Sequence, residues 1–174
     1  MESEGRVTKS TLMSYTVSDS PVGALLLAAD DVGLRRITFM RGRRAVRPDN
    51  SWREDAAPFQ ETIRQLRAYF AGSLETFDLP LAPEGTAFQQ EVWRRLCEIP
   101  YGETTSYGEI ARRLGRPQAS RAVGLANGTN PLPIVIPCHR VIGKTGKLTG
   151  YGGGLPIKEK LLALEQRQLR LLSL

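Results

Sequence analysis

The sequence predicts a small α/β domain, consisting of a sheet with one helix, over residues 1–82. It predicts a mainly α-helical domain with a winged-helix-like helix-turn-helix over residues 86–174. In the first half, short apolar runs alternate with turn residues, whereas apolar residues recur at helical spacing in the second. Proline and glycine residues break the stretch 78–85 between the halves, and 174 residues suffice for two small apolar cores.

The first half is expected to begin with a β-hairpin. The apolar runs 22–29 and 34–39 flank the turn-forming segment 30–33, a pattern typical of two strands joined by a tight connection. An earlier apolar run, 12–17, adds a possible third strand to the sheet.

One helix is predicted to follow the sheet. The charged stretch 41–55 is interpreted as a loop, and its basic part, 41–47, as a solvated segment. Apolar side chains then recur every three or four residues, and Gly72 ends the helix. These apolar residues are Phe59, Ile63, Leu66 and Phe70.

The second half begins with a helix that has a clear start. Thr86 and Gln89 form a capping-box pattern, in which each side chain bonds to the backbone N–H of the other residue. Val92 and Leu96 follow on one face of the helix. Cys97, next to Leu96, is interpreted as a small core residue.

Two short helices joined by a turn that contains glycine predict the helix-turn-helix. Ser106 starts the first with a second capping-box pattern, and Gly115 ends it. The second is predicted to run from about 118 to 126, and Asn127 and Gly128 then break it. Apart from Arg121 its residues are small, whereas helices that read the major groove carry several Arg, Asn or Gln residues. This slim helix suits a narrower groove and a low sequence preference; tight packing in the core is the alternative explanation.

Cys138, followed directly by His139, gives the strongest chemical signal, since His139 is the only histidine in the chain. The apolar run 134–136 before it is interpreted as a short buried strand. A thiol at the end of such a strand, with an imidazole beside it, is a candidate nucleophile with its base. A buried structural cysteine is the alternative.

A glycine-rich loop and a final helix follow this pair. The segment 143–147 is expected to form a turn. The segment 151–154, a tyrosine and three glycines, allows the backbone to approach a ligand closely. Pro156 begins the last helix. Glu165 lies on this helix and is a solvated surface residue unless it meets His139.

The charge distribution indicates a polyanionic partner, most often nucleic acid. The net charge is +6, but residues 1–84 carry 11 basic and 12 acidic side chains, whereas residues 85–174 carry 13 and 6. The polar N-terminus, the absence of a long apolar run and the two cysteines predict a cytoplasmic protein that contacts no membrane. One histidine and two cysteines are too few for a zinc site, so we expect no metal. We also expect no cofactor and a monomeric protein.

Several segments of the second half match one known family, in the same order. The matching segments are 99–103, 106–107, 120–124, 130–142, 151, 158–159 and 161–162. Over residues 88–165 the chain therefore resembles the O6-alkylguanine-DNA alkyltransferases. The first half is only loosely similar, mainly through the opening of its hairpin at 20–23.

The resemblance implies direct-reversal DNA repair, in which the O6-alkyl group of guanine, or the O4-alkyl group of thymine, moves to a protein cysteine. Cys138 would be the nucleophile, and His139 its base acting through a water molecule. Glu165 would orient His139, and Asn130 would brace the strand that presents the thiol. Attack on an sp³ carbon leaves a thioether with no acyl group to hydrolyse, so each molecule should react once.

The resemblance also implies a site on double-stranded DNA. The helix-turn-helix would occupy the minor groove with low sequence specificity, and the damaged base would be flipped out of the stack. Tyr107 would press on a phosphate and Arg121 would fill the gap left by the base. The further expected DNA contacts are Ser106, Ala122, Gly124 and Asn127. The base pocket is expected to comprise Tyr151, Val141, Gly152, Gly153 and Pro133, with room for the bulky substrate O6-benzylguanine.

Three other functions compete with this interpretation. A damage sensor without catalysis would have another residue in place of Cys138. A cysteine hydrolase would explain the Cys, His and Glu residues, but not the slim helix-turn-helix or the charge asymmetry. A DNA-binding regulator would not need the Cys-His pair. The chain also departs from some family members, which have a serine at the position of Gly152 or a zinc site in the N-terminal domain.

Overall fold

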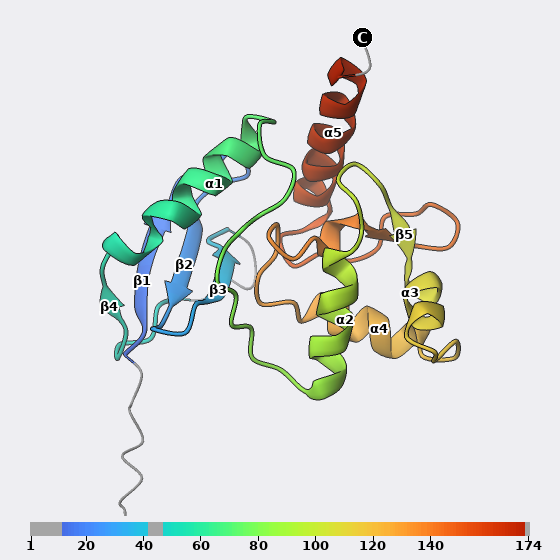
Figure 1. Cartoon of the computed structure of the whole chain (residues 1–174), viewed down its shortest axis with the longest axis horizontal. Helices are drawn as coiled ribbons and strands as arrows, with labels where there is room; N and C mark the ends of the chain where they lie inside the picture. Colours follow the sequence, from blue (N-terminus) through green and yellow to red (C-terminus); the bar gives the residue numbers. More distant parts are fainter. Residues whose placement is uncertain (1–11, 42–46, 173–174) are drawn as a thin grey trace, which may run out of the picture.

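The computed structural model describes residues 12–41 and 47–172, which form a sheet-and-helix part and a mainly helical part (Figure 1). The sheet has the order β3-β2-β1-β4. β2 pairs antiparallel with both β1 and β3, and β4 runs parallel to β1. The strands are β1 (Ser14–Ser18), β2 (Leu25–Ala29), β3 (Leu34–Phe39) and β4 (Arg53–Glu54).

The sheet confirms the predicted hairpin and third strand. The prediction of a loop over 41–55 was wrong in one respect, because β4 forms within it; residues 42–46 of the basic run lie outside the described residues. Every residue of β2 is buried, and this strand lies inside the sheet, between β1 and β3.

The helix predicted in the first half is α1 (Gln60–Phe70), preceded by the 3₁₀ turn η1 (Ala57–Phe59). Its buried face is rotated from the predicted one, since Ile63 and Phe70 are only partly buried. The buried residues follow the i, i+3, i+4, i+7 pattern of one helical face. They are Thr62, Gln65, Leu66 and Tyr69.

The connection between the two parts packs along the sheet edge. The Leu34 N–H donates to the Pro80 carbonyl at 2.7 Å, and the Ala82 N–H donates back to the Leu34 carbonyl at 2.9 Å. A Cβ added at Gly33 would lie 2.4 Å from the Pro80 oxygen, so only glycine permits this close approach. The stretch 78–85 between the halves is thus paired with the sheet, through a single parallel β-bridge between Leu81 and Leu34 of β3.

The helical part contains α2 (Ala87–Cys97), α3 (Tyr107–Arg113), α4 (Ser120–Gly128) and α5 (Leu155–Leu172), with a parallel pair of β5 (Thr105–Ser106) and β6 (Val141–Ile142). The capping box of α2 is confirmed by both of its hydrogen bonds. The predicted capping box of α3 is only half-formed. The Ser106 hydroxyl accepts from the Glu109 N–H, but the Glu109 carboxylate accepts from Arg112 and Arg113 and does not bond back to Ser106. α4 continues through Gly128, two residues past the predicted end.

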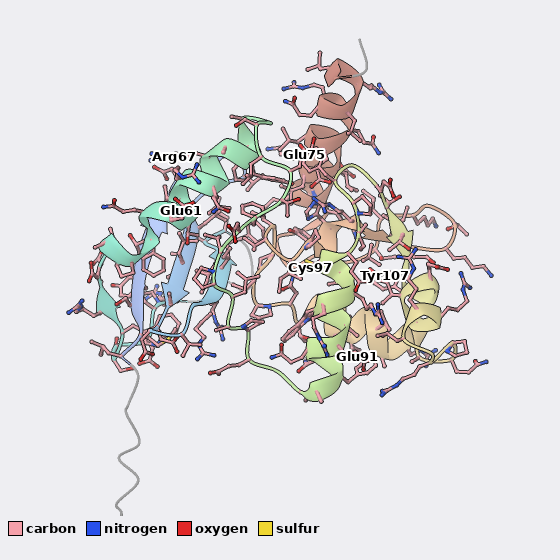
Figure 2. All side chains as sticks on the ribbon, in the orientation of Figure 1. Glu61, Arg67, Glu75, Glu91, Cys97 and Tyr107 are labelled. Carbon is pink, nitrogen blue, oxygen red and sulfur yellow. The ribbon has the colours of Figure 1, made fainter. Side chains whose placement is uncertain are left out.

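Cys97 is exposed at the last position of α2, so the prediction of a core residue was wrong (Figure 2). The helix buries Val92, Trp93 and Leu96 against its neighbours. The Trp93 Nε1–H donates to the Ala126 carbonyl at 2.8 Å, which fixes α4 against α2. Cys97 is one residue beyond Leu96, and so lies about 100° round the helix from it.

The run 134–136 is not a strand, although it is buried as predicted. It forms turns, with Ile134 at a φ of 77° and the Ile136 N–H bonded to the Leu132 carbonyl at 2.8 Å. Prolines at 131, 133 and 137 remove the N–H groups that a strand would need for pairing. Cys138 therefore begins a short 3₁₀ helix, η2 (Cys138–Arg140), rather than ending a strand.

The sheet-and-helix part and the helical part share one continuous hydrophobic core. The Ile37 N–H in β3 donates to the Pro131 carbonyl at 2.9 Å, which ties the sheet to the turns before Cys138. In the described part of the chain, no helix is long and apolar enough to span a bilayer.

Candidate active site

Cys138 lies at the wall of a pocket of about 240 Å³ formed by both parts of the molecule. The side chain is 4% exposed. β3 contributes Ile37 and Phe39, and the turns before η2 contribute Asn130 and Pro133. The glycine-rich loop before α5 closes the pocket with Tyr151 and Gly152.

Asn130 holds the turns that present the thiol. Its Nδ2 donates to the Ile136 carbonyl at 2.8 Å, and its Oδ1 accepts from the Leu132 N–H at 2.9 Å. The Cys138 N–H in turn donates to the Ile136 carbonyl at 2.7 Å. The side-chain amide of Asn130 therefore supplies hydrogen bonds to this segment that strand pairing would otherwise have supplied.

Glu165 accepts five hydrogen bonds in the interior. His139 Nε2 lies 2.7 Å from Oε1, which also accepts from the Tyr69 hydroxyl at 2.8 Å. Arg140 donates to both oxygens at 3.0 Å, and the Gly102 N–H donates to Oε2 at 3.1 Å. Burial raises the pKa of Glu165, but the bonds from His139 and Arg140 outweigh it and lower this pKa to about 2. The group is a carboxylate at neutral pH.

His139 is a neutral imidazole with one nitrogen available as a base. Burial lowers its pKa, and the positive charges of Arg140 and Lys158 lower it further, against the opposing effect of Glu165. Because an ionised Glu165 only accepts hydrogen bonds, the imidazole proton sits on Nε2. The buried Nδ1 keeps its lone pair and has no hydrogen-bond partner among the described residues.

The Cys138 thiol is protonated at rest. Burial raises its pKa to about 11, although the Asn130 amide and the charge of Lys158 act in the opposite direction. Lys158 on α5 is fully buried, and its Nζ donates to the carbonyls of Val141 at 2.6 Å and Thr149 at 3.1 Å. A thiol with this pKa reacts as a nucleophile only when a base takes its proton during the reaction.

The expected base-pocket residues divide into two groups. Tyr151, Gly152 and Pro133 line the pocket, and the Tyr151 ring lies 5.8 Å from that of Phe39. A Cβ on Gly152 would meet open space, whereas a Cβ on Gly153 would lie 2.8 Å from the Phe39 ring. Gly153 therefore packs against β3 instead of facing the pocket. Val141 is buried in β6 and lies outside the pocket lining.

The helix-turn-helix borders a second groove of about 570 Å³ that adjoins the pocket. Tyr107, labelled in Figure 2 at the start of α3, lines this groove, and its hydroxyl lies 2.7 Å from that of Thr149. Gly124 lines the groove as well. The residues shared with the Cys138 pocket are Gly128, Gly150, Tyr151 and Gly152.

The remaining expected DNA contacts differ in exposure. Arg121 and Ala122 are exposed on α4, and Ser106 is partly buried as the cap of α3. Asn127 is only 4% exposed, so its side chain does not share the open face of α4 with Arg121.

Sequence reasoning missed several residues around the His139–Glu165 pair. Tyr69 comes from α1 in the first half, where the only sign was the spacing of a buried helical face. Arg140 and Lys158 lie inside the matching segments, but their charges gave no indication that both would be buried. Gly102 contributes only a backbone N–H.

A buried thiol beside a His–Glu pair, joined by a groove to a helix-turn-helix, defines a cysteine-dependent transferase with a DNA-binding module. Two family models match the chain: "6-O-methylguanine DNA methyltransferase, DNA binding domain" over residues 87–167, and "6-O-methylguanine DNA methyltransferase, ribonuclease-like domain" over residues 13–83. The chain belongs to the 6-O-methylguanine DNA methyltransferase family.

Individual relatives agree over most of their length. The methylated-DNA–protein-cysteine methyltransferase of Methanosarcina acetivorans is 58% identical over 153 residues, which cover 88% of this chain and 98% of that protein. The protein of the same name from Mycolicibacterium paratuberculosis is 53% identical over 157 residues, covering 90% and 94%. The crystal structure of Mycobacterium tuberculosis OGT in complex with DNA has a TM-score of 0.83 at 50% identity, covering 89% and 94%.

Proposed function

We propose that the protein repairs alkylated DNA by moving the O6-alkyl group of guanine, and the O4-alkyl group of thymine, onto the sulfur of Cys138. The observation that carries this proposal is that the Cys138 pocket and the helix-turn-helix groove adjoin, with four lining residues in common. A base that leaves a duplex held on α3 and α4 would therefore emerge next to the pocket that holds the thiol.

The arrangement of groups supports a single transfer step. His139 Nδ1 takes the thiol proton through a water molecule, and the Glu165 carboxylate stabilises the imidazolium that forms. The thiolate then attacks the alkyl carbon, a C–S bond forms and the C–O6 bond breaks. The electron pair of that bond stays with guanine, which takes up a proton to become the normal base. A thioether is stable to water, so each molecule acts once.

The proposal assigns the two tasks to different parts of the chain. Residues 86–174 bind the minor groove of duplex DNA with low sequence specificity and carry the reacting groups. Residues 1–82 close the pocket through Ile37 and Phe39 and bond Glu165 through Tyr69. We place the protein in the cytoplasm as a monomer.

Intact-mass analysis after incubation with an O6-methylguanine oligonucleotide tests the proposal. One methyl group should stay on each protein molecule, and peptide mapping should place it on Cys138 and not on the exposed Cys97. A cysteine hydrolase would instead release product repeatedly and keep no added mass. A sensor would bind the oligonucleotide and leave the methyl group on guanine.

We expect Arg121→Ala to slow repair in duplex DNA much more than reaction with a free alkylguanine base. Flipping a base costs a few kcal/mol of unstacking, which an inserted arginine would offset, and a free base needs no flipping. The duplex rate should fall roughly tenfold to a hundredfold, since about 1.4 kcal/mol is a factor of ten. Single-turnover rates on both substrates measure this, and an equal loss on both would show that Arg121 is structural.

Tyr69→Phe should shift the pH profile of alkyl transfer. The Tyr69 hydroxyl shares the Glu165 oxygen with His139, so its removal leaves more negative charge for the His139 bond and raises the pKa of His139. Protonated His139 cannot accept the thiol proton, so the acidic limb of the profile should move to higher pH. Rates on a free alkylguanine base from pH 5 to 9 would measure this shift.

Tyr101→Phe is the matched control for Tyr69→Phe. The Tyr101 ring lies 6.2 Å from that of Tyr69, and its hydroxyl has no hydrogen-bond partner among the described residues. Its removal should leave the acidic limb in place. Identical profiles for the wild type and Tyr69→Phe would contradict the assigned role of Tyr69.

A further inference from the structure

Leu125 is the most exposed large apolar side chain among the described residues, at 72%. It lies within α4, the second helix of the helix-turn-helix. The opposite side of α4 is buried through Val123 and Ala126, and the Trp93 bond to Ala126 fixes the rotation of the helix. Leu125 therefore points outward as part of a rigid face and is not needed for the core.

The position of Leu125 on the helix places it in the middle of the open face. Successive residues lie about 100° apart, so Leu125 is about 40° from Arg121 on one side and about 60° from Ala122 on the other. Arg121, Ala122 and Gly128 are all exposed. Gly124 and Gly128 line the groove that leads to the Cys138 pocket. A duplex seated on the expected contacts Arg121 and Ala122 would lie against Leu125, which is between them on the exposed face.

We infer that Leu125 is a DNA-contacting residue that packs on the apolar sugar edges of the groove occupied by α4. This inference rests on the proposed function. Apolar side chains serve as contacts and wedges in minor-groove binders, whereas basic residues neutralise phosphates. Leu125 thus supplies a part of the affinity that is insensitive to salt, beside the salt-sensitive part from Arg121 and the other cations of this half.

The test measures affinity for an undamaged DNA duplex from low to high salt. Leu125→Ser should weaken binding roughly tenfold at every salt concentration, the loss expected for an apolar side chain of this size. The slope of log K against log salt should stay that of the wild type, because no phosphate contact is lost. Arg121→Ala should instead reduce the slope, because it removes a positive charge from the face that meets the polyanion. Leu125→Met, which keeps an apolar side chain, should restore most of the affinity.

Two controls separate a contact from a structural effect. Val32→Ser changes another apolar residue, 61% exposed in the β2–β3 turn, and should leave DNA affinity unchanged. The Tm of Leu125→Ser should match that of the wild type, because an exposed side chain contributes little to stability.

Wild-type affinity in Leu125→Ser, or a loss of affinity that follows a fall in Tm, would overturn the inference and leave the proposed function intact. A reduced salt slope in Leu125→Ser would overturn it too. A wild-type protein that transfers alkyl groups but does not bind duplex DNA would remove the DNA-binding part of the proposed function, and this inference with it.

Discussion

Cys138→Ser is expected to abolish alkyl transfer and to leave binding to duplex DNA intact. Serine differs from cysteine by one atom, so the 4% exposed position and its Asn130 brace should keep their shape. A hydroxyl ionises far less readily than a thiol and is a much weaker nucleophile toward an alkyl carbon. The proposed DNA contacts on α3 and α4 do not involve the sulfur. Methyl retention after incubation with an O6-methylguanine oligonucleotide, with DNA affinity measured in parallel, checks both parts.

Cys97→Ser is the matched control for Cys138→Ser, because Cys97 is the only other cysteine and is exposed at the end of α2. This variant should transfer the methyl group at the wild-type rate. An adduct on Cys97, or methyl removal by Cys138→Ser, would contradict the assignment of the nucleophile.

Local sequence patterns predicted the elements whose causes are local. The capping box of α2 needs only Thr86 and Gln89, three residues apart, and the hairpin needs only two apolar runs and the turn between them. The run 134–136 shows where this reasoning failed. Its residues are buried as a strand's would be, but the prolines around them forbid a ladder, and Asn130 supplies the missing hydrogen bonds.

The site was predictable as far as the matching segments reach, and not where contacts join distant parts of the chain. The His139–Glu165 pair was expected on condition that the two residues meet, and they do so at 2.7 Å. Tyr69 lies 96 residues from Glu165 in sequence, and no local pattern connects them. Which side of α4 is exposed depends on its packing against α2, so Asn127 was expected on the DNA face and Leu125 was overlooked.

The contacts between the two parts suggest that the sheet-and-helix part is more than a support. Ile37 bonds the turns before Cys138, and Tyr69 bonds Glu165. Phe39 packs against both Tyr151 and Gly153. A change in β3 or α1 would therefore alter the pocket or the His139–Glu165 pair directly, as well as the stability of the fold.

O6-benzylguanine is expected to inactivate the protein by leaving a benzyl group on Cys138. Gly152 adds no side chain to the pocket wall beside Tyr151 and Pro133, and the space in front of it is open. A benzylic carbon also reacts faster with a thiolate than a simple alkyl carbon. Incubation with excess O6-benzylguanine, followed by intact-mass analysis, should show one benzyl group per protein and no remaining activity on O6-methylguanine DNA.

Gly152→Trp should confer resistance to O6-benzylguanine by filling the open space of the pocket. Gly153, which was also expected in the base pocket, is unsuitable for this test, because a tryptophan side chain there would collide with the Phe39 ring and disturb the packing between the two parts. Gly152→Ser is the matched control: its small side chain meets no atom within 4 Å and should leave the protein sensitive. A Gly152→Trp variant that is folded and still fully sensitive would place the benzyl group elsewhere in the pocket. An unmodified wild type that still repairs O6-methylguanine DNA would mean that a part of the protein other than this loop closes the pocket to the ring.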